Sequence, residues 1–228
     1  MKIAEIYRSI QGEGILTGTE SVFVRISGCN LRCWFCDTPY ASWEPEGDDY
    51  SVNEIMDQIS VWDSRHVVLT GGEPMLFAEM IPLCNRLRAE NYHITIETAG
   101  TLFLPVECDL MSISPKTSNS APDAIEHPRW HRRHERTRFA PHVITQLLES
   151  YNHQIKFIVD HEDDLLEIAE YIRQFPMMSA SRVYLMPQGQ TQDELDKTEV
   201  WLKPLCRQFN YQYCPRKQIE WFGAVKGT

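Results

Sequence analysis

The chain has 228 residues, of which 43% are hydrophobic, so it is long enough for one large domain, or at most two, with a substantial core. Its formal net charge of −10 argues against nucleic-acid binding, because affinity for a phosphate backbone depends on a basic surface. The N-terminal residues contain no apolar run long enough for a signal or membrane segment, and the seven cysteines are an odd number. We therefore expect a cytoplasmic protein without a membrane anchor.

Apolar segments typical of strands alternate along the chain with segments typical of amphipathic helices. We expect strands at residues 22–26, 66–70, 94–97, 110–114, 155–159 and 183–186. We expect helices at residues 51–61, 77–88, 143–150, 163–174 and 193–207, the first opening with a capping box of Ser51 and Glu54. The predicted fold is therefore α/β, an open, partial (β/α) barrel of about six βα units, because six fall short of the eight that close a full barrel. Periodicity leaves a flat doubly wound sheet as the alternative.

We expect residues 1–228 to form a single domain with two less regular segments. Residues 116–141 read as an irregular insertion, and loops of that length are usually functional or mobile. Within the insertion, residues 127–139 contain five arginines and one glutamate, a net charge of +4 that leaves −14 for the rest of the chain. Residues 208–228 form a C-terminal closing segment, to which we assign no ligand.

Three cysteines near the start of the chain, Cys29, Cys33 and Cys36, follow the spacing C-x3-C-x2-C. A structural zinc site needs four protein ligands, and a [4Fe–4S] cluster usually has a thiolate on each iron, so three ligands leave one position open to a small molecule. An open position is typical of a catalytic metal site. The alternatives are three buried free thiols, or a zinc site completed by a distant histidine. The other cysteines stand singly and are expected to pack in the core: Cys84, Cys108, Cys206 and Cys214.

With an aromatic residue, Phe35, before the third cysteine, this spacing resembles the radical S-adenosylmethionine (SAM) superfamily. In that superfamily the three thiolates hold a [4Fe–4S] cluster, and SAM occupies the fourth iron. The turn Gly71-Gly72-Glu73-Pro74 follows a predicted strand and resembles the superfamily's GGE motif, which contacts the amino group of the cofactor. Alone, such a turn also fits an ordinary βα connection. Both motifs fall at the carboxyl ends of strands, where ligands gather in folds of this class.

Further motifs narrow the resemblance. They are Ile10-Gln11-Gly12-Glu13-Gly14, Arg25, Cys36-Asp37-Thr38, Glu97-Thr98-Ala99-Gly100-Thr101 and Ser114-Pro115-Lys116. Their order and approximate spacing are similar to those of the 7-carboxy-7-deazaguanine synthase family over nearly the whole chain. Members of this radical SAM family act in queuosine and 7-deazapurine biosynthesis, converting 6-carboxy-5,6,7,8-tetrahydropterin to 7-carboxy-7-deazaguanine with loss of ammonia. The resemblance implies a carbon–nitrogen lyase that uses a [4Fe–4S] cluster, SAM and Mg2+.

The resemblance also implies roles for individual residues. Cluster ligands would be Cys29, Cys33 and Cys36, and the Mg2+ ligand would be Thr38. The SAM pocket would contain Phe35, Cys36, Asp37, Gly72, Ser114, Pro115, Lys116, Met186, Pro187, Gln188 and Gly189. The substrate pocket would contain Ile10, Gln11, Gly12, Arg25 and Thr70. The residues by themselves leave plainer roles open. Arg25 could pair with a neighbouring acid, Gln11 and Glu13 could face solvent in a turn, and Thr38 could cap the loop before Pro39.

The implied partners are a pterin as small-molecule substrate, a flavodoxin-like electron donor and a second copy of the chain in a homodimer. A flavodoxin is acidic, so the basic stretch at residues 127–139 would steer its approach, with a solvated surface insertion as the alternative. Two other functions stay open. A glycyl-radical-enzyme activase would abstract hydrogen from a partner protein without any pterin. A non-catalytic iron–sulfur or zinc binding module would never cleave SAM.

Overall fold

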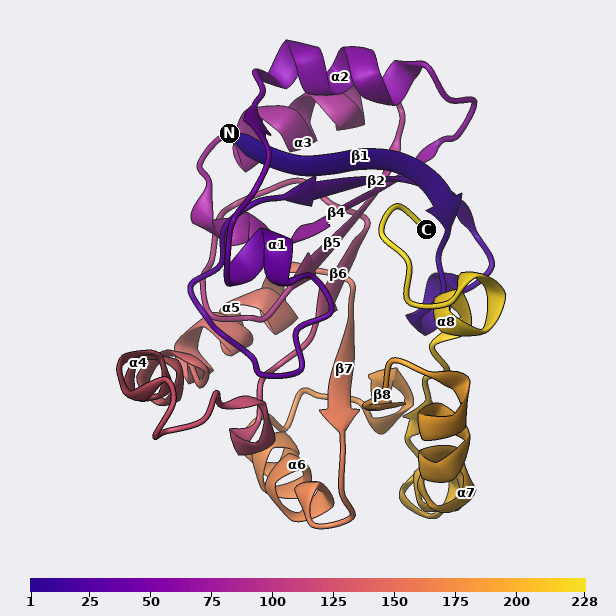
Figure 1. The fold of residues 1–228 in the computed structure, drawn as a ribbon. Helices are drawn as coiled ribbons and strands as arrows, with labels where there is room; N and C mark the ends of the chain where they lie inside the picture. Colours follow the sequence, from indigo (N-terminus) through magenta and orange to yellow (C-terminus); the bar gives the residue numbers. More distant parts are fainter.

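The computed structural model describes residues 1–228, which form one nine-stranded sheet flanked by helices (Figure 1). The strands are β1 (Lys2–Ile10), β2 (Glu20–Ile26), β3 (Asp48–Asp49), β4 (His66–Gly71), β5 (His93–Thr98), β6 (Leu110–Ile113), β7 (His153–Val159), β8 (Val183–Pro187) and β9 (Gln212–Tyr213). The helices are α1 (Pro39–Ser42), α2 (Val52–Ser60), α3 (Met80–Ala89), α4 (Pro128–Thr137), α5 (Pro141–Ser150), α6 (Asp164–Arg173), α7 (Gln192–Phe209) and α8 (Lys217–Phe222).

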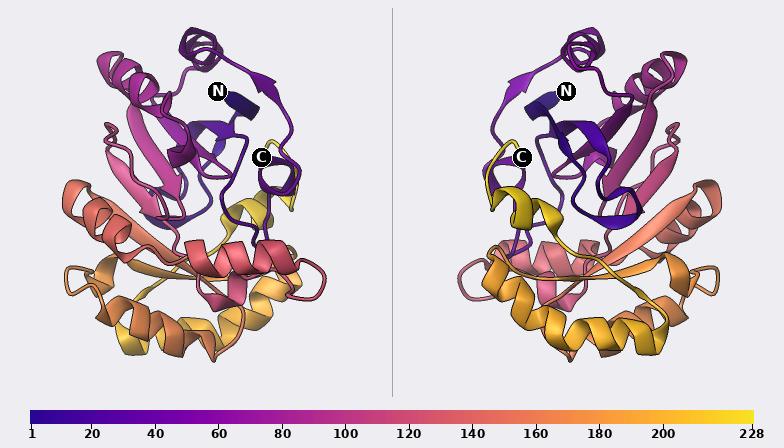
Figure 2. Two further views of the ribbon diagram at one scale, coloured as in Figure 1. Left: turned by 90° about the vertical axis from the view of Figure 1, so that its left-hand side faces the viewer. Right: turned by 90° about the vertical axis from the view of Figure 1, so that its right-hand side faces the viewer.

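The sheet is open and mainly parallel. Its strand order is β3-β1-β2-β4-β5-β6-β7-β8-β9, with β1 antiparallel to β2 and β3 and all later neighbours parallel. The edge strands β3 and β9 do not pair, so the sheet curves without closing, with helices along its outer side (Figure 2). A doubly wound sheet would reverse its strand order at a switch point, whereas here the order rises steadily from β1 to β9 once β3 has joined the edge. The predicted open, partial (β/α) barrel is therefore confirmed.

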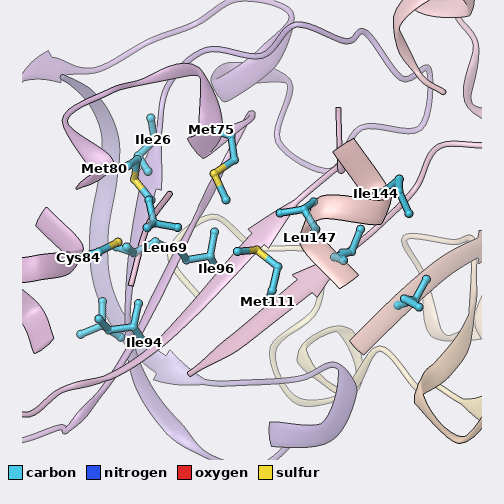
Figure 3. Packing of buried hydrophobic residues seen from close by; sticks show 14 of the residues in the cluster. Ile26, Leu69, Met75, Met80, Cys84, Ile94, Ile96, Met111, Ile144 and Leu147 are labelled. Carbon is cyan, nitrogen blue, oxygen red and sulfur yellow. The ribbon is translucent and has the colours of Figure 1, made fainter. Parts of the chain in front are cut away.

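The alternation of side chains gives the two faces of the sheet different contents. On β7, Ile155, Phe157 and Val159 are fully buried in the main apolar cluster, whereas Gln154 and Lys156 point to the inner side. Figure 3 shows part of this cluster, where strand residues meet side chains of α3 and α5: Ile26, Leu69, Ile94, Ile96, Met111, Met80, Cys84, Ile144 and Leu147. The helices thus cover the apolar face and leave the inner face to polar groups.

The description of residues 116–141 as irregular is wrong for its central part, where α4 forms a ten-residue helix. Arginine and histidine dominate this helix, so it lacks the apolar stripe by which a helix is recognised in a sequence. The sequence pattern also misses β1, whose residues are mostly half-exposed and which joins the sheet through its antiparallel pairing with β2. By contrast, the capping box is confirmed, because Ser51 Oγ accepts from Glu54 N and Glu54 Oε2 accepts from Ser51 N.

The closing segment, residues 208–228, contains β9 and α8. Helix α8 lies against the end of β1, where Lys217 N donates to the Gly12 carbonyl at 3.0 Å. A Cβ atom on Gly12 would lie 2.1 Å from Gln218 Oε1, so a side chain there would displace α8. None of the helices combines the length and apolar character needed to cross a membrane.

Candidate active site

The cysteine loop, residues 27–38, lies between β2 and α1 and is bound through its backbone to the turn after β4. Glu73 N donates to the Gly28 carbonyl at 2.8 Å, and Gly28 N donates to the Ala41 carbonyl at 2.8 Å. A Cβ atom on Gly72 would lie 2.1 Å from the Gly28 carbonyl oxygen. Glycine is required there because the two backbones approach too closely for a side chain. The two motifs that the sequence pairs are therefore in direct contact.

The three thiols of the loop are free and partly buried. The pKa of Cys29 and of Cys33 is raised to about 12, chiefly by burial, and the charge of the neighbouring cysteines acts in the same direction. The charge of Lys116 opposes the pKa shift at Cys33. Because ionising them together is costly in the bare protein, a bound metal group is what would hold them as thiolates.

The donor set of this loop fits a [4Fe–4S] cluster, because three free, partly buried thiols stand on one short segment. A [4Fe–4S] cluster takes each thiolate on a different iron, so its ligands surround a volume. Three neighbouring thiols on one loop match that requirement.

Behind the loop, the Glu73 carboxylate is completely buried. It accepts hydrogen bonds from Thr98 Oγ1 at 2.8 Å, Ala99 N at 2.8 Å and Met75 N at 3.1 Å. Burial nevertheless raises its pKa, against the effect of these donors. The Glu73 side chain therefore has a structural role, because its hydrogen bonds join the end of β5 to the turn after β4. Only the backbone of this turn is left to contact a ligand.

Charged side chains meet on the inner face of the sheet. Lys156 Nζ of β7 lies 2.8 Å from Glu97 Oε1 of β5 and 2.9 Å from Glu13 Oε2 in the loop after β1. Thr70 Oγ1 of β4 donates to Glu97 Oε2 at 2.9 Å. Burial alone would lower the pKa of Lys156, but Glu97 and Glu13 outweigh it and raise that pKa above its ordinary value. The buried ammonium therefore stays charged between two carboxylates.

Arg216, just before α8, extends this group and ties three loops together. Its Nε lies 3.4 Å from Glu13 Oε1, its Nη1 donates to the Gly189 carbonyl, and its Nη2 pairs with Asp37 of the cysteine loop. Burial alone would raise the pKa of Glu13, but Lys156 and Arg216 outweigh it and hold that pKa at about 2. We call Glu13, Glu97, Lys156 and Arg216 the inner charge cluster.

Two predicted substrate residues, Arg25 and Thr70, are neighbours across β2 and β4. Arg25 Nε pairs with Glu5 Oε1 at 2.6 Å, and its Nη2 donates to Tyr7 Oη at 2.8 Å. Arg25 therefore does pair with a neighbouring acid, Glu5, which is one of the roles that the sequence left open for it. Nη1 makes no hydrogen bond within the protein, so one corner of the guanidinium stays available to a ligand.

The other predicted substrate residues lie at the end of β1. Gln11 does not face solvent, since it is buried and its Nε2 donates to Ser21 Oγ at 2.9 Å. Gly12 contacts α8, as described above, and Ile10 is exposed. The segment predicted to bind substrate therefore lies beside the inner charge cluster, but the Gln11 side chain already forms a hydrogen bond within the protein.

Thr38 lies immediately before α1, yet its side chain makes no capping hydrogen bond, which argues against the plainer role for it. Its hydroxyl lies 3.9 Å from Cys36 Sγ. Phe35 is buried and packs edge-on against Trp34.

The remaining residues predicted to hold SAM follow β6 and end β8. Lys116 Nζ turns back to Ser114, contacting its carbonyl at 2.6 Å and its hydroxyl at 2.7 Å. Met186 is buried, and the Gln188 N–H donates to the Val159 carbonyl at 2.8 Å. Both segments lie at the carboxyl ends of parallel strands, the edge that also carries the cysteine loop.

Comparison with known proteins agrees with this geometry. Residues 23–202 match the radical SAM superfamily. The chain is 49% identical to 7-carboxy-7-deazaguanine synthase of Rhodopirellula baltica over 227 residues, 99% of this chain and 88% of that protein. It is 40% identical to the protein of that name from Halobacterium salinarum, over 96% of this chain and 89% of that protein. The chain belongs to the 7-carboxy-7-deazaguanine synthase family.

Membership of the 7-carboxy-7-deazaguanine synthase family makes the chain a radical SAM enzyme, and the superfamily implies a [4Fe–4S] cluster and SAM. The crystal structure of QueE from Escherichia coli matches with a TM-score of 0.69 at 22% identity, covering 94% of this chain and 92% of that one, which shows a common fold. The family resemblance of the sequence is confirmed. These matches support neither the activase nor the non-catalytic module.

None of the four members of the inner charge cluster, Glu13, Glu97, Lys156 and Arg216, was predicted from the sequence to bind a ligand. Lys156 carried a usable signal, because a lysine between Ile155 and Phe157 in an apolar strand is rarely buried without a partner. Arg216 carried none, since its partners lie far away in the sequence.

Proposed function

We propose that this enzyme converts 6-carboxy-5,6,7,8-tetrahydropterin to 7-carboxy-7-deazaguanine, a ring contraction that releases ammonia. The observation that carries the proposal is that the cysteine loop and the inner charge cluster meet through the Asp37–Arg216 pair. They do so in a chain 49% identical, over 99% of its length, to a protein named for that product. Loss of ammonia balances the atoms with no net oxidation, so the reaction needs no second substrate.

The proposed substrate pocket joins Arg25 and Thr70 with Ile10, Gln11 and Gly12. Arg25 would bind the pterin carboxylate through its unpartnered Nη1, a charge-assisted hydrogen bond. Glu5 and Tyr7 support this role because they fix the rest of the guanidinium. The segment from Ile10 to Gly12 would close the pocket from the end of β1, backed by α8.

The proposed cofactor site uses the cysteine loop and the strand ends beside it. Cys29, Cys33 and Cys36 would hold the cluster. SAM would lie along Phe35, Cys36, Asp37, Gly72, Ser114, Pro115, Lys116, Met186, Pro187, Gln188 and Gly189. When bound, the two cofactors supply the one-electron chemistry that begins the reaction. The chain's own residues would orient the substrate against them and exclude water.

We also propose that Thr38 contributes its hydroxyl to a Mg2+ ion that orients the substrate carboxylate. The absence of a capping hydrogen bond leaves this hydroxyl available. Magnesium usually keeps several waters and needs few protein ligands, so one hydroxyl beside a bound substrate is a reasonable share of its coordination.

Two partners complete the proposal. A flavodoxin-like protein would donate electrons, and a second copy of the chain would form a homodimer. The exposed aromatic residues Trp221 and Phe222 of the closing segment support self-association, since exposed large aromatics are typical of interfaces. Light scattering of the purified protein tests the dimer.

An anaerobic assay tests the function. The iron-reconstituted protein is incubated with dithionite, SAM, Mg2+ and 6-carboxytetrahydropterin, and 7-carboxy-7-deazaguanine is followed by mass. We expect product with the natural chain and none with the Cys33→Ala variant, which loses a cluster ligand. Omitting Mg2+ should slow turnover of the natural chain by a much larger factor than it slows turnover of a Thr38→Ala variant.

Other outcomes would redirect the assignment. SAM cleavage without product would keep the radical SAM chemistry and discard the pterin. Hydrogen abstraction from a partner protein in the absence of pterin would favour the activase. A reduced, iron-loaded protein that never cleaves SAM would favour a binding module.

A further inference from the structure

Helix α4 presents a row of arginines to solvent. Arg129, Arg132, Arg133 and Arg136 are exposed, and none of them forms an ion pair with an acidic residue. We call these four residues the α4 arginine face. It stands on a chain whose remaining residues are strongly acidic. An unpaired cationic row on an acidic protein creates a local positive potential that attracts a negatively charged partner.

The inner side of α4 is fixed to the cysteine loop. His134 is 1% exposed, and its Nδ1 accepts from Arg32 N at 3.3 Å. Its Nε2 lies 2.9 Å from Ser120 Oγ, whose own hydrogen is donated to the Thr117 carbonyl. Nε2 therefore carries the ring proton. The Arg32 guanidinium stacks on the Trp130 ring at 4.1 Å, so two residues of α4 hold the residue directly before Cys33.

The residue directly after Cys33 reaches solvent. Trp34 is 52% exposed, although its indole N–H donates to the Asn119 carbonyl at 2.7 Å and its backbone N–H donates to the Ser120 carbonyl at 3.2 Å. An exposed large aromatic held in one position is typical of an interface residue. It lies on the same loop that α4 contacts through Arg32.

We propose that the α4 arginine face and the Trp34 ring form the docking surface for an acidic protein that delivers single electrons to the cysteine loop. This inference rests on the proposed function, which needs a reduced cluster at Cys29, Cys33 and Cys36. In the step itself the donor is oxidised by one electron and the cluster is reduced by one, and no bond or proton moves. The docked partner would sit over the loop that α4 supports, in front of the molecule as drawn in the left view of Figure 2.

An RNA is the other class of ligand that an arginine row could bind. The net charge of −10 opposes a long phosphate backbone, which extends beyond a single helix. The direct contact between α4 and the cysteine loop also means that an electron donor bound to α4 would lie near the cysteines. The position of the arginine face therefore favours the protein partner.

The test compares two triple charge reversals with equal change in net charge. The first is Arg132→Glu, Arg133→Glu and Arg136→Glu on α4. The control is Arg173→Glu on α6 with Lys197→Glu and Arg207→Glu on α7, all exposed and without an ion pair. Figure 1 shows α4 and α7 on opposite sides of the molecule. Each iron-loaded protein is assayed with reduced flavodoxin and, separately, with dithionite.

We expect the α4 variant to lose about tenfold or more in kcat/KM for flavodoxin, because electrostatic steering raises association rates by about 10 to 1,000-fold. Dithionite-driven turnover should be unchanged, which also shows that the variant folds. The control should keep both activities. Biolayer interferometry with oxidised flavodoxin should show the same weakening of binding in the α4 variant alone, without depending on turnover.

Three results would overturn the inference. The first is unchanged flavodoxin kinetics in the α4 variant, and the second is an equal loss in the control, which would reflect net charge. The third is an RNA hairpin whose gel shift disappears in the α4 variant while flavodoxin binding persists. A natural chain that fails to cleave SAM even with dithionite would refute the proposed function instead, and the interferometry would still test the surface. A milder variant with glutamine at the three α4 positions repeats the test if the reversal fails to fold.

Discussion

The two faces of the curved sheet use neighbouring residues of the same strands in opposite ways. On β7, Phe157 is fully buried among apolar side chains, and Lys156 beside it is 4% exposed among carboxylates. Burial does not distinguish them, so the difference lies in their surroundings. Apolar burial stabilises the fold directly, whereas a buried charge contributes little net stability even when it is paired. The outer face therefore accounts for the stability of the fold, and we attribute the inner face to function.

Phe157→Ala should have the largest effect on stability. Removing a fully buried aromatic ring leaves a cavity in the outer face, so the free energy of unfolding should fall by about 4 kcal/mol. Turnover per folded molecule should stay unchanged, because Phe157 points away from the inner charge cluster. Anaerobic urea unfolding and the product assay measure the two quantities. A loss of turnover without loss of stability would contradict the division between the faces.

Lys156→Met should combine a smaller loss of stability with a much larger loss of activity. The change removes the ammonium from Glu13 and Glu97 and leaves them partly unpaired, which should lower the free energy of unfolding by about 3 kcal/mol. Turnover should fall far below that of Phe157→Ala at equal folded concentration. Lys156→Arg is the matched control, since it keeps the positive charge and should keep most of the stability. A stable, fully active Lys156→Met variant would contradict the assignment of the inner face to function.

The smallest effect should be a pH dependence confined to the inner face. The pKa of Glu13 is about 2 in the folded chain, below the value of about 4.3 for an unfolded glutamate. A lowered pKa contributes stability that is fully present above about 4.3 and is lost as the pH falls towards about 2. The difference in unfolding free energy between the natural chain and Glu13→Gln should therefore shrink from pH 6 to pH 3. The corresponding difference for Phe157→Ala should not change, and a constant gap for Glu13→Gln would contradict the assigned pairing.

Much of the site could be predicted because it depends on residues close together in the sequence. The spacing of Cys29, Cys33 and Cys36 and the glycines before Glu73 are local patterns with a physical requirement behind each. The alternation of apolar strands and helices predicted the parallel strands β2 and β4–β8 in their order. These features are recognisable because hydrophobic period and backbone freedom act over a few residues.

Other parts could not be predicted because their signals are weak or distant. Helix α4 carries almost no apolar residues, so its arginines read as a loop although Trp130 and His134 fix the helix to the cysteine loop. The sequence of β1 has neither a strand pattern nor a helix pattern of hydrophobic residues, because this strand is stabilised by its pairing with β2. The sequence could indicate that residues 127–139 are basic, but it could not say what they lie beside.

The sequence by itself determined the open α/β architecture, the three-thiol motif and the family to which they belong. The tertiary structure decided which charges meet: Lys156 reaches Glu13 across 143 positions of the chain, and Arg216 reaches Asp37 across 179. It also decided that α4 contacts the cysteine loop and presents its arginines to solvent. Such contacts depend on the curvature of the whole sheet and on the return of the C-terminal segment to its open edge, and no local period in the sequence encodes either one.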